Sequence, residues 1–192
     1  MRVVKHARYA ASKHLKALPH FQSLARNGTH LMLTLSSGYR PLRAMLHLRE
    51  LMQHRAPVLI RALLSAYIEV SKSHNLTLRT LTPSTVMLDR SFSQVIFSDI
   101  SELCQQDDGT QPSTLPPLPY SAMLLPAYRK SPRCHTIFDR WSVGVIMLEI
   151  LLGTSAVMTI TSIPAAEDLF DLSRKFLDKD TVAVIKYLLF AT

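Results

Sequence analysis

The chain has 192 residues, of which 47% are hydrophobic and 19% are charged. This balance predicts one globular domain with a hydrophobic core and excludes an intrinsically disordered chain. The two cysteines, Cys104 and Cys134, are too few for a disulfide framework, and no repeated Cys/His spacing of a zinc site surrounds them. We therefore expect reduced thiols in an intracellular protein.

The net charge of +8 is concentrated towards the N-terminus. Residues 1–61 contain 11 Lys and Arg and one acidic residue, a net of +10, whereas residues 62–192 contain 11 basic and 13 acidic residues, a net of −2. A basic surface of this kind attracts acidic protein, anionic lipid or nucleic acid. Basic clusters with interleaved aromatic residues are missing from the sequence, so nucleic acid is not an expected partner.

Residues 1–27 contain no Asp or Glu and combine Arg and Lys with Ala, Ser and Leu, a composition typical of a mitochondrial presequence. The same residues fit an amphipathic helix, with Ala10, Ala11, His14, Leu15 and Leu18 near one face, and we favour this interpretation. No apolar stretch of a secretory signal follows the first basic residues. The cytoplasm is the expected location, and the mitochondrion is the alternative.

The middle of the chain alternates apolar runs with turn signals. We expect one buried strand, two helices and two short strands, at Leu31–Leu35, Pro41–His54, Ala56–Ser73, Thr85–Asp89 and Gln94–Ser98. Residues 101–120 concentrate Gly, Pro, Ser, Thr and Asp, which predicts a long mobile loop.

The apolar stretch 142–163 is long enough to cross a bilayer. Glu149 near its middle is costly in lipid, and Gly153-Thr154-Ser155 is typical of a helix end. We therefore expect a buried helix at Asp139–Gly153 and no membrane span.

Two amphipathic helices are expected near the C-terminus, at Ala165–Phe176 and Thr181–Phe190. Either Asp178 or Asp180 is placed to cap the second of these helices.

Three motifs in this order resemble the C-terminal lobe of a eukaryotic protein kinase. LRTLTPST at Leu78–Thr85 is similar to the catalytic loop H-R-D-L-K-x-x-N, and Asp99 falls at the Asp of the D-F-G motif. FDRWSVGVIMLEILLG is similar to the helix that anchors this lobe, and it keeps the family's spacing at Asp139, Trp141, Ser142, Gly144, Glu149 and Gly153. The resemblance extends from about Leu31 to about Phe190.

The resemblance implies an α+β fold that is mostly α: a protein-kinase-like helical C-lobe with a truncated small lobe of a first helix and one or two strands. Residues 1–35 would be the remnant of the small lobe, or a targeting segment. Residues 36–192 would form the C-lobe, with 99–127 as a loop like the kinase activation segment.

The loop lacks the side chains that phosphoryl transfer needs. The resemblance places Thr80 at the catalytic Asp, Thr82 at the Lys and Thr85 at the metal-binding Asn. A threonine hydroxyl cannot act as a carboxylate base near neutral pH and is a poor metal ligand. Asp99 is the one conventional magnesium ligand left, and no Gly-rich phosphate loop or V-A-x-K strand is present. No cofactor is therefore expected.

Other family residues are expected to be structural. Asp139 would accept hydrogen bonds from backbone N–H groups around Arg79, and Trp141, Gly144 and Glu149 would hold the anchoring helix. In the family, Arg79 would meet a phosphorylated residue, for which Ser113, Thr114 and Ser121 are the candidates here. In the alternative that we favour, the side chain of Arg79 donates hydrogen bonds to backbone carbonyls.

These observations predict a catalytically impaired pseudokinase that binds or scaffolds other proteins, such as an active kinase or a partner with an acidic surface. The expected binding surface is the basic region Arg40–Arg61 together with the Pro-rich loop. One alternative is a divergent or fragmentary Ser/Thr protein kinase that uses ATP and Mg²⁺. The other is a basic mitochondrial or nucleic-acid-associated helical protein.

Overall fold

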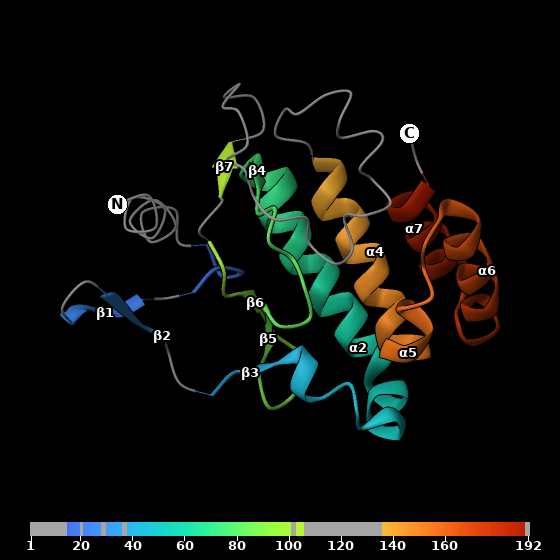
Figure 1. The fold of residues 1–192 in the computed structure, drawn as a ribbon, viewed down its shortest axis with the longest axis horizontal. Helices are drawn as coiled ribbons and strands as arrows, with labels where there is room; N and C mark the ends of the chain where they lie inside the picture. Colours follow the sequence, from blue (N-terminus) through green and yellow to red (C-terminus); the bar gives the residue numbers. More distant parts are fainter. Residues whose placement is uncertain are drawn as a thin grey trace.

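A computed structural model describes residues 15–19, 21–27, 30–35, 38–100, 103–105 and 136–190. Within this part the protein is mostly helical with small antiparallel sheets (Figure 1), which confirms the mostly helical α+β class. The structure of residues 1–14, most of the 99–127 loop and the three candidate phosphorylation sites, Ser113, Thr114 and Ser121, lies outside the described residues.

Two long helices form the centre of the molecule. Helices α2 (Arg49–Ile68) and α4 (Thr136–Leu152) pack against each other (Figure 1). Every residue from Trp141 to Ile150 in α4 is buried. The helix ends before Gly153, whose φ of +91° is a conformation that glycine adopts at low cost. The expected buried helix ending near Gly153 is therefore confirmed.

Helix α2 corrects the sequence prediction of two separate helices, Pro41–His54 and Ala56–Ser73. The chain forms a 3₁₀ turn, η1 (Leu42–Ala44), then one α-helix that contains Pro57, and then a π-helical turn, η2 (Glu69–Ser73). A proline inside a helix costs about 3 kcal/mol or more because it removes a hydrogen bond and crowds the preceding turn. Buried residues continue at helical spacing on both sides of Pro57, and their packing outweighs this cost.

The central sheet is antiparallel and has the order β3-β5-β6, formed by Arg40–Pro41, Val86–Leu88 and Val95–Phe97. Leu88 lies opposite both Arg40 and Val95, so the short strand β5 is paired on both edges. Strand β6 is fully buried and lies against α2. The strands predicted at Thr85–Asp89 and Gln94–Ser98 are therefore present as β5 and β6, each shorter than expected.

A second pair of strands, β4 (Leu76–Thr77) and β7 (Cys104–Gln105), corrects the prediction that residues 101–120 are all loop. Thr77 lies opposite Cys104, and Leu76 opposite Gln105. This pairing joins segments that are far apart in the sequence, and the local composition does not indicate it.

The N-terminal segment also differs from the prediction. Residues Leu15–Pro19 form a turn rather than a helix, with Leu15, Ala17 and Leu18 buried. The backbone N–H groups of Lys16 and Ala17 donate to the Glu69 carboxylate at 2.7 and 3.1 Å. The Glu69 carboxylate, which is distant in the sequence, thus accepts hydrogen bonds from these two N–H groups. In a helix, backbone N–H groups donate to backbone carbonyls instead.

Strands β1 (Phe21–Asn27) and β2 (His30–Leu35) follow this turn and pair as an antiparallel hairpin. The strand predicted at Leu31–Leu35 is therefore present, and a further strand precedes it. In Figure 1 the hairpin lies to one side of the helices.

The C-terminal helices are α5 (Thr154–Val157), α6 (Ile163–Ser173), the 3₁₀ turn η3 (Arg174–Phe176) and α7 (Lys179–Phe190). Both α6 and α7 contact α4, and the rings of Phe170 and Phe190 meet edge to face at 5.7 Å. The carboxylate of Asp178 accepts from the N–H of Thr181 at 2.8 Å, which confirms Asp178 as the cap of α7.

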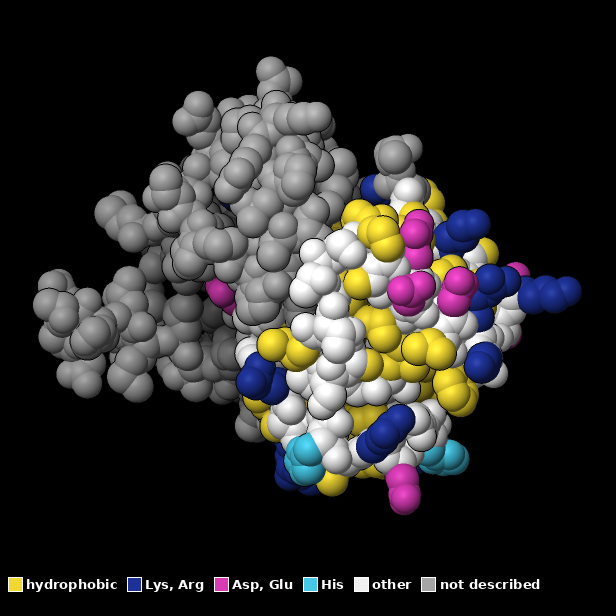
Figure 2. Space-filling model, turned by 45° about the vertical axis from the view of Figure 1, so that its right-hand side comes forward, with side chains coloured by type: hydrophobic (Ala, Val, Ile, Leu, Met, Phe, Trp, Pro, Cys, Tyr) yellow, Lys and Arg dark blue, Asp and Glu magenta, His cyan; other side chains and the backbone are white. Residues whose placement is uncertain are grey.

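Figure 2 shows hydrophobic side chains among charged ones on the side that carries these helices. The exposed large hydrophobic residues in this region are Met158, Ile163, Leu172, Phe176, Val184 and Tyr187. No helix among the described residues is long and apolar enough to cross a membrane.

Candidate functional site

The loop Leu78–Thr85, called the threonine loop below, connects β4 to β5 and lies against the beginning of α4. Asp139, in the first turn of α4, holds its first two residues. The Asp139 carboxylate accepts from the N–H groups of Leu78 at 2.5 Å and Arg79 at 2.7 Å. These are the backbone hydrogen bonds that the sequence predicted for Asp139.

The pair of hydrogen bonds holds a strained backbone in place. Arg79 has a φ of +64°, the left-handed region that residues other than glycine rarely adopt. Such a conformation costs on the order of 1–3 kcal/mol and persists only where its surroundings enforce it. Asp139 provides this constraint from a position 60 residues away in the sequence.

Asp139 itself is 2% exposed. Burial disfavours its ionised form and raises the pKa of its carboxyl from 3.8 to about 6, against the opposing effect of the hydrogen bonds from Leu78 and Arg79 and of the Arg79 charge. The neighbouring Tyr67, on α2, is also affected: burial raises its pKa to about 12, and the negative charge of Asp139 contributes in the same direction.

The three threonines at the positions of the kinase Asp, Lys and Asn lie together. The Thr80 hydroxyl donates to the backbone carbonyl of Asp99 at 3.0 Å and lies 3.4 Å from that of Leu78. Thr80 is 6% exposed. Its hydroxyl therefore joins the loop to the segment that follows β6.

Thr85 closes the other end of the loop. Its hydroxyl donates to the carbonyl of Thr80 at 2.8 Å and accepts from the N–H of Thr82 at 2.9 Å. A second contact joins it to the carbonyl of Thr82 at 3.1 Å, and the Thr82 hydroxyl lies 3.4 Å away. Thr85 is thus the centre of the hydrogen bonds within the loop.

Backbone contacts fix the loop to its surroundings. The N–H of Ser98 donates to the carbonyl of Thr85 at 2.8 Å, and the Ser98 hydroxyl donates to the same carbonyl at 3.1 Å. The N–H of Arg43, in η1, donates to the carbonyl of Pro83 at 2.8 Å. The loop is therefore a rigid connection between the sheet, η1 and α4.

Asp99, the predicted magnesium ligand, is partly buried beside this loop, and its backbone carbonyl binds Thr80. Among the described residues, no group of three or more His, Cys, Asp or Glu side chains is placed to hold a metal ion.

The remaining predicted residues lie along α4. Trp141 and Glu149 are each 2% exposed, and the Trp141 Nε1 atom has no hydrogen-bond partner within the described ranges. A Cβ atom on Gly144 would lie 2.6 Å from Leu189 Cδ2 and 3.3 Å from Leu188 Cβ. Glycine at this position allows α7 to approach α4 closely.

Arg140, for which the sequence suggested no role, lies over the Tyr187 ring, with its guanidinium carbon 5.3 Å from the ring centre. This cation–π contact links the start of α4 to α7. The hydrogen bonds that the N-terminal turn donates to Glu69 were likewise not predicted, since no local pattern marks either interaction.

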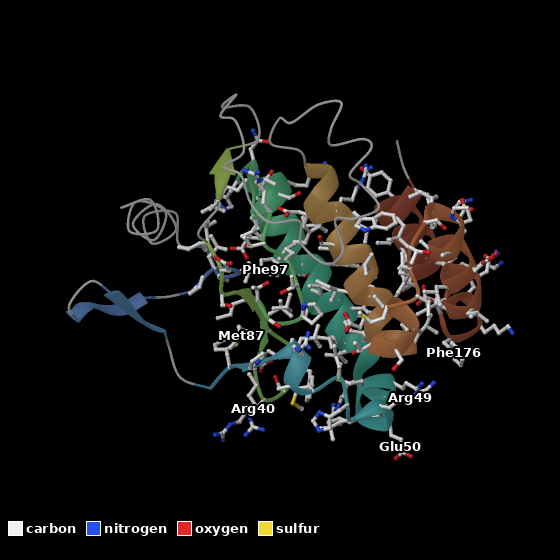
Figure 3. The ribbon with its side chains drawn as sticks, in the orientation of Figure 1. Arg40, Arg49, Glu50, Met87, Phe97 and Phe176 are labelled. Carbon is white, nitrogen blue, oxygen red and sulfur yellow. The ribbon has the colours of Figure 1, made fainter. Side chains whose placement is uncertain are left out.

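The basic region Arg40–Arg61 is accessible. All of its five arginines are exposed, and Glu50 is its one acidic residue. Figure 3 shows Arg40 and Arg49 on the outside of the molecule, Arg40 from β3 and Arg49 at the start of α2. The region predicted as a binding surface is thus positively charged along η1 and α2.

Comparisons with protein-family models and with curated proteins find no match to this chain.

Proposed function

We propose that this chain is a catalytically impaired protein-kinase-like domain, a pseudokinase, that acts as a protein-binding or scaffolding module. The proposal starts from the resemblance of the threonine loop, Asp99 and α4 to the three kinase motifs. It is supported by the hydrogen bonds between Asp139 and the backbone of Leu78 and Arg79, because they join two of these motifs in space.

The main support for impaired catalysis comes from the hydrogen bonds that the loop hydroxyls make. Thr80 donates to the Asp99 carbonyl, and Thr85 donates to the Thr80 carbonyl. The two hydroxyls thus make hydrogen bonds within the loop or to the segment beside it, and this is a structural role. A kinase needs here a carboxylate that accepts the substrate proton and an amide that binds magnesium.

The lost chemistry is not restored nearby. A hydroxyl whose proton is bound to a carbonyl is a weak base, and a threonine in place of Lys removes the positive charge that would stabilise the transferring phosphate. Asp99 alone offers one carboxylate to a magnesium–nucleotide complex, which favours weak binding at best.

A protein-binding role is supported by the exposed basic region Arg40–Arg61. Exposed positive charge speeds the encounter with an acidic partner and selects against basic ones. The partner of the proposed module is therefore a protein with an acidic surface, such as an active kinase with an acidic patch.

The proposal is tested by measuring the melting temperature and phosphate transfer with Mg²⁺-ATP. We expect no rise in melting temperature beyond one degree at millimolar nucleotide, and no transfer of labelled phosphate to a protein substrate. A rise of several degrees that disappears in Asp99→Ala would contradict the absence of nucleotide binding. Transfer that Thr80→Ala abolishes, and that the exposed control Thr161→Ala leaves unchanged, would favour the active-kinase alternative.

A further inference from the structure

A small pocket lies at the end of the central sheet, beside the basic region. We call it the hairpin pocket, after the hairpin of β5 and β6. It has a volume of about 140 Å³ and is lined by Arg40, Met45, Leu88, Asp89, Arg90 and Phe92. Its walls come from β3, the turn after η1, the end of β5 and the turn between β5 and β6. An engineered cavity of about 150 Å³ accepts benzene, so this pocket is large enough for one apolar side chain.

The pocket is preformed, because Asp89 organises the turn that makes one wall. Its carboxylate accepts from the N–H of Gln94 at 2.8 Å and from the N–H of Ser91 at 3.2 Å, and the Ser91 hydroxyl also donates to it. Burial acts to raise the pKa of Asp89, but these hydrogen bonds outweigh it and lower the pKa below its usual value. The carboxylate therefore stays ionised and bound to its own turn.

Phe92 gives this wall its apolar character at a conformational cost. It has a φ of +63° and is 8% exposed. A bulky residue in the left-handed region is strained, and such residues cluster at functional sites, including those that hold ligands. The N–H of Phe92 donates to the Asp89 carbonyl at 3.2 Å, which helps to hold the ring against the pocket.

The floor of the pocket is apolar and its rim is positive. Leu88 and Phe92 are buried and Met45 is partly buried, whereas Arg40 and Arg90 are exposed. The exposed Arg43 follows Arg40 on η1 and adds a third positive charge to the same end of the molecule. One acidic side chain, Asp89, lies among these groups, and its oxygens already bind Ser91 and Gln94.

We propose that the hairpin pocket binds an acidic peptide segment of a partner protein, with one aliphatic or aromatic side chain in the pocket and flanking carboxylates on Arg40 and Arg90. The inference rests on the proposed function, because it names the site and the chemistry of the protein partner. Arginine binds carboxylate in a two-pronged geometry, so carboxylates on both sides of an apolar residue match the rim. Burial of the apolar side chain supplies affinity that charge alone does not.

Peptide arrays test this pairing of charge and apolar contact. The full chain is incubated with nine-residue peptides that carry Leu, Met, Phe or Ser at the centre, flanked on both sides by Glu, Ser or Lys. We expect binding to peptides with an apolar centre and Glu flanks, and at least tenfold weaker binding when the centre is Ser or the flanks are Lys. Equal binding of apolar and Ser centres, or no preference for Glu flanks, would overturn the proposal.

Charge-reversal variants locate the site. In fluorescence anisotropy with the best peptide of the array, Arg40→Glu/Arg90→Glu should weaken binding at least tenfold. The matched control Lys175→Glu/Lys186→Glu makes the same charge change at exposed residues of η3 and α7, and it should change binding less than twofold. Equal loss in both variants would show a general charge effect and overturn the pocket as the site.

Two further measurements test nucleic acid as the occupant of the pocket and separate the pocket proposal from the proposed function. A single-stranded oligonucleotide that binds more tightly than any peptide, and loses affinity in Arg40→Glu/Arg90→Glu, would overturn the peptide as occupant. The melting temperature with Mg²⁺-ATP tests the proposed function independently, because the hairpin pocket is distinct from the threonine loop. The pocket proposal can thus fail while the absence of nucleotide binding stands, and the reverse also holds.

Discussion

Helix α4 and the threonine loop are in contact, yet they keep different parts of the pattern that they resemble. Helix α4 carries acidic, aromatic and glycine residues at the spacing of the kinase helix that it resembles, and all of Trp141–Ile150 is buried. The loop retains its connection to Asp139 but carries threonine at each chemically active position. Packing and buried hydrogen bonds restrict the residues of α4, whereas the side chains of Thr80 and Thr85 are restricted by the hydrogen bonds that their hydroxyls make.

The loop threonines have a structural role in the observed fold. In the loop, the hydroxyls of Thr80 and Thr85 donate to backbone carbonyls, so they stabilise the conformation that the Asp139 hydrogen bonds begin. If this interpretation is right, variants of α4 and of the loop should differ in stability in a defined order.

The largest effect is expected for Asp139→Ala. The substitution leaves the N–H groups of Leu78 and Arg79 without their acceptor and releases the constraint on the φ of Arg79. We expect a loss of about 3–5 kcal/mol in the free energy of unfolding, since breaking a buried charged network costs this much. Urea denaturation followed by circular dichroism measures it. Asp178→Ala, which removes an exposed helix cap, is the control and should cost clearly less; equal losses would contradict the role of Asp139.

The second effect is a dependence of stability on pH. The Asp139 pKa is about 6 in the folded protein, above its ordinary value of 3.8. The part of its contribution to stability that depends on protonation is therefore complete below pH 3.8 and lost as the pH rises through about 6. Between pH 7 and pH 4.5, acidification should raise the free energy of unfolding by about 2 kcal/mol, because the slope approaches 1.36 kcal/mol per pH unit only below about pH 6. Asp139→Asn should remove this slope, and a slope that persists in the variant would assign it to another group.

A smaller effect is expected where α4 meets α7. In Gly144→Ala, the new methyl group would lie 2.6 Å from Leu189 Cδ2, so the two helices must shift or Leu189 must change rotamer. Overpacking of this kind costs about 1–3 kcal/mol. Leu189→Ala makes space for the methyl group, so the double variant should lose less than the sum of the single losses. Additive losses in this double-mutant cycle would contradict the close approach.

The smallest effect compares two threonines within the loop. Thr85→Val removes a hydroxyl that bonds to the Thr80 carbonyl and the Thr82 N–H, and should cost about 1–2 kcal/mol. Thr82→Val removes a hydroxyl that lies 3.4 Å from the Thr85 hydroxyl, and should change stability by less than about 0.5 kcal/mol. Thermal denaturation of both variants measures the difference. A greater loss in Thr82→Val would reverse our assignment of the loop's central residue.

Sequence reasoning located much of the candidate site because the threonine loop and α4 are each marked by a contiguous motif. The apolar stretch before Gly153 predicted a buried helix, and the backbone partner that the kinase resemblance implied for Asp139 is the one observed. Sequence could not assign a role to Arg140, since its partner Tyr187 lies on α7. It also placed a helix end before Pro57, because local propensity does not register the packing of α2 against α4.

The sequence by itself determined the mostly helical class, the positions of the α4 and α7 helices and the absence of a carboxylate at position 80, and it limited the cap of α7 to Asp178 or Asp180. These properties depend on residue identity and on neighbours within a few positions. Tertiary structure alone decided the turn at Leu15–Pro19, the directions of the threonine hydroxyls and the hairpin pocket. Each depends on groups that are distant in the chain, such as Lys16 and Glu69, 53 residues apart, and only the folded backbone brings such donors and acceptors within hydrogen-bonding distance.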